Sequence, residues 1–117
     1  MEHQANPIIN IDIQHFQQIL RNIINNSENA IPKNKEGVII LRLEETESQA
    51  IIEIEDNGTG IDESMVEHIF DPKFSTKSSS SGLGLHICQK IVEYYKGNLS
   101  FITQTDHGTC FKIIFPK

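Results

Sequence analysis

The first patterned segment of the chain covers residues 12 to 31. Its apolar side chains recur at intervals of three and four positions, at Phe16, Ile19, Leu20, Ile23, Ile24, Ala30 and Ile31. This spacing places them on one side of a helix, so the segment predicts an amphipathic helix with one buried face. Pro32 disfavours helical geometry in the residue before it and marks the expected end of the helix.

Two segments rich in β-branched residues follow, at positions 37–45 (GVIILRLEE) and 50–56 (AIIEIED). A short polar turn separates them, and together they predict an antiparallel hairpin. A second hairpin is predicted near the end of the chain, where NLSFITQ and TCFKIIF flank a turn at residues 105–108.

A second helical pattern covers residues 83–95, with apolar side chains one turn apart at Leu83, Ile87 and Ile91. Gly97 lies just past its end, where a left-handed backbone is often required. Earlier in the chain, Asp62 is placed to cap a short helix through Ile69, and the residues after it read as a loop.

The order of elements is helix, hairpin, loop, helix and hairpin. This order predicts an α+β fold, a two-layer α/β sandwich with helices on one face of a mixed, mostly antiparallel sheet. The length of 117 residues fits one domain. We therefore expect a single domain over residues 1–117, in which residues 1–11 form an N-terminal lead-in.

The charge balance narrows the classes of partner. The chain has 10 Lys and Arg residues against 16 Asp and Glu residues, a net charge of −6. A nucleic-acid partner is not expected, because a duplex binder needs a basic face. A single nucleotide remains compatible, since a few backbone amides and a metal ion can hold one phosphate chain.

Other features of the composition favour a soluble protein. Cys88 and Cys110 lie in apolar segments without metal-ligand spacing, which favours two reduced core thiols. No apolar run is long enough to span a bilayer, and the start of the chain lacks a signal-peptide pattern. We expect a cytoplasmic, monomeric domain without membrane contact of its own, which is compatible with excision from a longer, membrane-anchored protein.

Three asparagines form a polar stripe on the first predicted helix. At ~100° per residue, Asn22, Asn26 and Asn29 lie within roughly 60° of one another. Asparagine is a poor helix former, but its amide can ligate Mg²⁺ or meet phosphate oxygens. The alternative is a solvated polar face.

Asp56 continues the inward alternation of Ile52 and Ile54 and precedes a glycine turn. A carboxylate on an apolar face is costly unless a donor pairs with it, and an adenine amino group is one such donor. Gly58 and Gly60 would let the backbone turn sharply and a flat ring approach. The alternative is an ordinary Asn-Gly turn.

The last candidates are a glycine pair and a threonine. Gly82 and Gly84 stand at the start of the second predicted helix, where free amides favour an anion, and Lys77 could add a charge. Thr109 could turn a hydroxyl inward. Each signal is weak alone, but their joint occurrence in this order is much less probable by chance.

These motifs together resemble the GHKL ATP-binding superfamily, most closely the catalytic ATP-binding domain of bacterial sensor histidine kinases. LRNIINNSENAIP is similar to the family's N box, IEDNGTGI to its first glycine box, IFDPKFSTK to its F box and SSGLGLHICQKIVEYYKG to its second glycine box. GTCFKIIFP is similar to its closing strand. The resemblance covers nearly the whole chain and implies the Bergerat fold, with ATP and Mg²⁺ as cofactors.

The resemblance also implies roles for individual residues. Asn26 would ligate Mg²⁺, with Asn22 and Asn29 facing the phosphates. Asp56 would accept the hydrogen bond from the adenine amino group, helped by Thr109 through water. The remaining implied ATP-binding residues are Gly58, Gly60 and Ile61 beside the base, Gly82, Leu83, Gly84 and Leu85 at the phosphates, and Phe70, Phe74 and Lys77 in a lid at about residues 70–82.

The implied reaction is transfer rather than hydrolysis. ATP-hydrolysing members carry a glutamate one turn before the metal-binding asparagine, and here that place holds Asn22, which is no base. The implied acceptor is a histidine on a separate dimerisation domain, which would pass the phosphoryl group on to a response regulator. The histidines of this chain lie outside any acceptor-like motif: His3, His15, His68, His86 and His107.

The chain departs from the family pattern in three places. The usual first glycine of the second glycine box is Ser80, the usual His-Gly-Gly reads Tyr95-Lys96-Gly97, and the lid is short. We expect weaker phosphate contacts without loss of binding. The serine run before Gly82 is expected to be a mobile part of the lid. A serine kinase of the anti-sigma type and a non-catalytic nucleotide-binding module are the alternatives.

Overall fold

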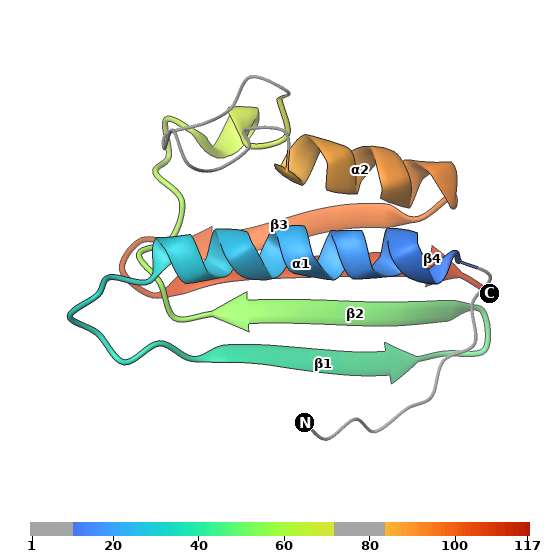
Figure 1. Ribbon diagram of the computed structural model, residues 1–117, viewed down its shortest axis with the longest axis horizontal. Helices are drawn as coiled ribbons and strands as arrows, with labels where there is room; N and C mark the ends of the chain where they lie inside the picture. The colour runs from blue at the N-terminus through green and yellow to red at the C-terminus, as the bar shows by residue number, and fades with distance from the viewer. Residues whose placement is uncertain (1–10, 72–83) are drawn as a thin grey trace.

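The computed structural model describes residues 11–71 and 84–117. Two helices, α1 (Ile13–Ala30) and α2 (Gly84–Tyr94), cover one face of a four-stranded sheet (Figure 1). The strands are β1 (Ile39–Glu45), β2 (Gln49–Asp56), β3 (Asn98–Gln104) and β4 (Gly108–Pro116), in the order β1-β2-β4-β3. All neighbouring strands are antiparallel. The two-layer α+β sandwich and both hairpins predicted from the sequence are confirmed.

The core lies between the helices and the sheet, and its residues follow the two predicted periodicities. The inward positions of β2 alternate as Ala50, Ile52, Ile54 and Asp56, and all four are buried. The helices supply residues one turn apart to the same core. The other buried apolar side chains of this core are Ile19, Ile23, Ile69, Leu85, Cys88, Val92, Phe111, Ile113 and Phe115.

The ends of α1 follow from its sequence. Asp12 caps the first turn by accepting a hydrogen bond from the Gln14 amide at 2.8 Å. The helix ends at Ala30, and Ile31 is already extended in front of Pro32. The proline signal therefore located the end of the helix correctly.

Two local predictions were wrong. The helix expected between Asp62 and Ile69 is only a turn followed by a three-residue 3-10 helix, Val66–His68. The Asp62 carboxylate does accept hydrogen bonds from the Ser64 amide and hydroxyl, as a capping residue would, but no α-helix follows it. After α2 it is Lys96, not Gly97, that has the left-handed backbone, with a φ of 62°.

Gly97 is required for a different reason. Its amide bonds the carbonyl of Val92 at 2.8 Å, the contact that closes a Schellman motif. A Cβ atom on Gly97 would lie 2.6 Å from the carbonyl oxygen of Ile114. The glycine therefore allows the chain to pass close to β4.

The two cysteines differ. Both are free thiols, but only Cys88 is buried in the core. Cys110 is half-buried because it occupies an outward position of β4, between the buried residues Thr109 and Phe111. The prediction of a second core thiol was therefore wrong. In residues 11–71 and 84–117, no helix is long and apolar enough to cross a membrane.

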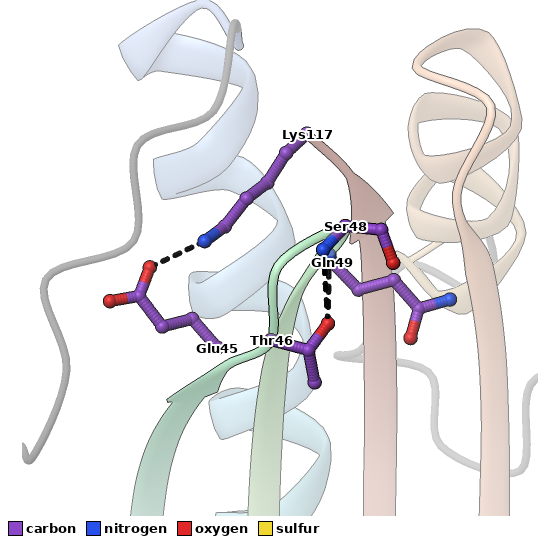
Figure 2. Close-up of polar contacts among 5 residues, drawn as sticks. All are labelled: Glu45, Thr46, Ser48, Gln49 and Lys117. Carbon is purple, nitrogen blue, oxygen red and sulfur yellow. Dashed lines mark hydrogen bonds and ion pairs between the residues drawn. The ribbon is translucent and has the colours of Figure 1, made fainter.

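The β1–β2 turn and the predicted functional residues lie at opposite ends of the sheet. At one end, the β1–β2 turn is closed by Thr46, whose hydroxyl accepts from the Gln49 amide at 3.0 Å. Lys117 reaches the same turn and pairs with Glu45 at 2.6 Å (Figure 2). The predicted functional residues Asp56 and Thr109 lie at the opposite end, where α1 and β2 both finish (Figure 1).

Candidate functional site

Asp56 is a buried carboxylate at this end of the sheet. Its side chain is 3% exposed, and its Oδ1 atom accepts hydrogen bonds from the amides of Gly58 at 2.8 Å and Thr109 at 3.3 Å. Its Oδ2 atom is buried without a partner. An unpaired buried carboxylate oxygen costs on the order of 1–3 kcal/mol or more, so this atom is suited to a donor from a ligand.

Close backbone contacts hold Asp56 in place. A Cβ atom on Gly108, whose φ is 120°, would lie 2.0 Å from the carbonyl oxygen of Asp56. A Cβ atom on Gly58 would lie 2.6 Å from the carbonyl oxygen of Ala30. These glycines therefore let the β2 turn pack directly on the end of α1 and on β4. This packing role of Gly58 differs from the role predicted from the sequence, which was to let the flat adenine ring approach the backbone.

Thr109 is part of a hydroxyl pair. Its Oγ1 atom lies 2.9 Å from the Oγ1 atom of Thr103, its register partner on β3. Thr103 also accepts a hydrogen bond from the Ile61 amide at 2.8 Å. This pair joins Thr109 and Ile61 to the same cluster as Asp56. Thr103 was missed from the sequence, although it occupies an inward position of β3 opposite Thr109.

We expect Thr103→Val to lower the free energy of unfolding by about 1–3 kcal/mol, because the part-buried Ile61 amide loses its acceptor. Thr103→Ser keeps the hydroxyl and should retain most of the stability. Urea unfolding of the three proteins tests this. Equal stability of the valine variant and the wild type would show that the Thr103 hydroxyl does not hold this segment.

Asn22, the first residue of the asparagine stripe, lies beside the start of α2. The Asn22 amide donates to the carbonyl oxygen of Gly84 at 3.3 Å. Burial raises the pKa of the nearby Cys88 thiol to about 12, and a hydrogen bond with the Asn22 side chain acts in the opposite direction. Asn26 is half-buried and Asn29 is exposed. Two segments far apart in sequence, the N box and the second glycine box, are thus in contact.

Phe70 and Leu85 are both held by contacts within the domain. The Phe70 ring packs edge-on against Phe101, with centroids 5.8 Å apart, and its carbonyl accepts from His86 Nδ1 at 3.1 Å. The Leu85 side chain is buried in the core, so only its backbone can face a ligand. Four predicted site residues, with most of the predicted lid, lie outside the described residues: Phe74, Lys77, Gly82 and Leu83.

One further polar residue was missed from the sequence. Ser27 is fully buried on α1, and its hydroxyl has no hydrogen-bond partner. Among residues 11–71 and 84–117, the buried side-chain polar atoms without a partner are Ser27 Oγ and Asp56 Oδ2. The signal in the sequence was a serine one turn after Ile23, on the apolar stripe.

The described residues do not form a preassembled metal centre. Within them, no group of three or more His, Cys, Asp and Glu side chains could hold a metal ion. Mg²⁺ bound with a nucleotide has a different requirement, because one or two protein oxygens suffice beside phosphate and water ligands. The half-buried Asn26 amide, one helical turn after Asn22, supplies such an oxygen.

Comparisons with known proteins agree with this arrangement. The family described as histidine kinase-, DNA gyrase B- and HSP90-like ATPase matches residues 11–117. The signal transduction histidine-protein kinase AtoS of Escherichia coli (strain K12) is 37% identical over 99% of the chain and 19% of its own length. Sporulation kinase C of Bacillus subtilis (strain 168) is 34% identical over 93% of the chain and 25% of its own length.

A solved structure supports the same relationship. The catalytic domain of histidine kinase ThkA superimposes with a TM-score of 0.83 and 29% identity, covering 98% of this chain and 75% of that one. The chain spans 19% and 25% of the lengths of AtoS and sporulation kinase C. The similarity is therefore to one part of these longer proteins.

Proposed function

This chain belongs to the family of histidine kinase-, DNA gyrase B- and HSP90-like ATPases, and on that premise we propose that it is the catalytic domain of a protein-histidine kinase. It binds Mg-ATP and donates the γ-phosphoryl group to a histidine on a separate dimerisation domain of the same kinase. A response regulator then receives the phosphoryl group from that histidine. The domain works in the cytoplasm.

The observation that carries the proposal is the unpartnered Oδ2 atom of Asp56. A carboxylate oxygen can only accept a hydrogen bond, and the exocyclic amino group of adenine can only donate one here. The other carboxylate oxygen, Oδ1, already accepts hydrogen bonds from two backbone amides. The carboxylate is therefore fixed in direction and complementary to adenine.

The helix residues would hold the triphosphate. The amide oxygen of Asn26 would ligate Mg²⁺, which neutralises charge on the phosphate oxygens when it is bound. Asn22 and Asn29 would contact phosphate oxygens from the same side of α1. The backbone amides at the start of α2, at Gly84 and Leu85, would face them from the other side.

The side chains favour transfer over hydrolysis. Asn22 cannot remove a proton from water, and its amide already donates to the carbonyl of Gly84. A positioned histidine would attack the γ-phosphorus directly, so this domain needs only to orient the phosphates. Its own contribution is binding, orientation and charge neutralisation.

The proposal is tested by mixing the chain with γ-labelled ATP, Mg²⁺ and the separately purified dimerisation domain. We expect an acid-labile, base-stable phosphohistidine on the added domain, and at least about a hundredfold less with Asn26→Ala, since charge neutralisation at the phosphates supplies several kcal/mol. The matched control is Asn25→Ala, because Asn25 occupies the preceding helix position and its side chain is exposed. Release of free phosphate without acceptor labelling, or an acid-stable product, would contradict the proposal.

A further inference from the structure

His86 joins two segments of the chain, because its side chain contacts a residue 16 positions earlier in the sequence. Its Nδ1 atom lies 3.1 Å from the carbonyl oxygen of Phe70, in a part-buried contact. A carbonyl oxygen can only accept a hydrogen bond, so Nδ1 carries the proton and donates it. The contact therefore links the Phe70 carbonyl to the first turn of α2, where His86 lies.

The acceptor of this hydrogen bond is itself held in place. The Phe70 ring packs edge-on against Phe101, with centroids 5.8 Å apart. The residue before it, Ile69, is 1% exposed and belongs to the core. The backbone at Phe70 is thus fixed from the sheet, so its carbonyl can orient the imidazole of His86.

The first turn of α2 is also held by α1, through the Asn22 amide that donates to the carbonyl of Gly84 at 3.3 Å. The first amides of a helix have no partner within the helix, and in the proposed complex those of Gly84 and Leu85 face the phosphates. The direction of these amides depends on the orientation of the turn. His86 fixes that orientation from the Phe70 side.

We propose that His86 is a positioning residue for the triphosphate, whose bond to the Phe70 carbonyl aims the first amides of α2 at the phosphate oxygens. The inference rests on the proposed binding of ATP and adds a residue whose side chain acts through the backbone of α2. A turn that is ordered before the nucleotide binds costs less to order on binding. The effect is therefore confined to ligands that carry phosphates.

The test compares His86→Asn with His86→Gln. The NH₂ nitrogen of asparagine is bonded to Cγ, as Nδ1 of histidine is, so it can reach the Phe70 carbonyl, whereas that of glutamine lies one bond further out. We expect His86→Asn to bind Mg-ATP within about twofold of the wild type, and His86→Gln about threefold to tenfold more weakly, the loss expected for one hydrogen bond. Helix propensity favours glutamine, so a merely structural role predicts the opposite order.

Mg-ATP affinities are measured by calorimetric titration, and adenosine, which carries no phosphate, by displacement. All three proteins should bind adenosine equally. Tyr95→Phe is the matched control, because it removes a hydroxyl at the other end of α2 that accepts from the Asp12 amide at 3.1 Å and lies 2.6 Å from His15 Nδ1. Tyr95→Phe should leave the Mg-ATP affinity unchanged.

Urea unfolding without nucleotide checks that each variant is folded. Equal Mg-ATP affinities of His86→Gln and wild type would overturn the inference, and so would an equal weakening by His86→Asn or by Tyr95→Phe. A matching loss of adenosine affinity in His86→Gln would overturn it as well, since the phosphates would then not be involved. Failure of the wild type to bind Mg-ATP at all would instead refute the proposed function, and the inference with it.

Discussion

Gly108→Ala is expected to lower the free energy of unfolding by about 3–5 kcal/mol, the range of the most damaging single substitutions. A Cβ atom at this position would lie 2.0 Å from the carbonyl oxygen of Asp56, an atom of the neighbouring backbone that cannot move aside alone. The φ of 120° adds strain for any residue with a side chain. Urea unfolding followed by circular dichroism measures the loss.

Gly37→Ala is the matched control for this substitution. Its Cβ atom would approach the Ile31 side chain, with the nearest atom, Cδ1, at 3.0 Å, and the flexible end of that side chain can rotate. We expect a change within about 1 kcal/mol. If Gly108→Ala were no more destabilising than Gly37→Ala, the close packing of β4 on the Asp56 turn would be wrong.

Asp56→Asn is expected to weaken ATP binding by about a hundredfold while the domain stays folded. The substituted side chain must keep an oxygen at the Oδ1 position, because the amides of Gly58 and Thr109 both donate there. Its NH₂ group then replaces Oδ2 and faces the adenine amino group, donor against donor. Loss of a hydrogen bond to a charged group together with this mismatch corresponds to about 2.7 kcal/mol.

Calorimetric titration with Mg-ATP measures this effect. Glu53→Gln is the matched control, because Glu53 lies on the same strand with its side chain on the opposite face of the sheet. It makes the same change of charge and should bind ATP like the wild type. If Asp56→Asn and Glu53→Gln bound ATP equally well, the assignment of Asp56 to the base would be refuted.

The elements could be predicted from the sequence because each carries a long and regular period. The three-and-four spacing around Ile19 and Ile23 and the alternation through Ile52 and Ile54 are both set by burial, and both are confirmed. The short helix predicted after Asp62 was wrong because so few residues contain no apolar period that could distinguish a helix from a turn. The left-handed residue after α2 is Lys96 and not Gly97. The sequence suggested Gly97 because glycine is common at that position, whereas here the glycine is required by its close packing on the Ile114 carbonyl.

The buried polar position of Asp56 could be predicted because a charged residue is conspicuous on an apolar face of a strand. Asp56 occupies an inward position of β2 that is otherwise apolar, and its burial is confirmed. Thr103 and Ser27 were missed because small hydroxyl residues are compatible with both strands and helices, and only the tertiary structure shows their partners or lack of them. The outward position of Cys110 was missed because strand phase alone does not identify the covered face.

The measurement that tests the central claim most directly is a calorimetric titration of the wild-type chain with Mg-ATP and with Mg-GTP. Guanine carries a carbonyl oxygen at C6, which would place an acceptor against the unpartnered acceptor Oδ2 of Asp56. We predict saturable binding of one ATP per chain, with GTP at least about tenfold weaker, the effect of one mismatched polar contact. Absence of saturable ATP binding, or equal affinity for GTP, would contradict the account.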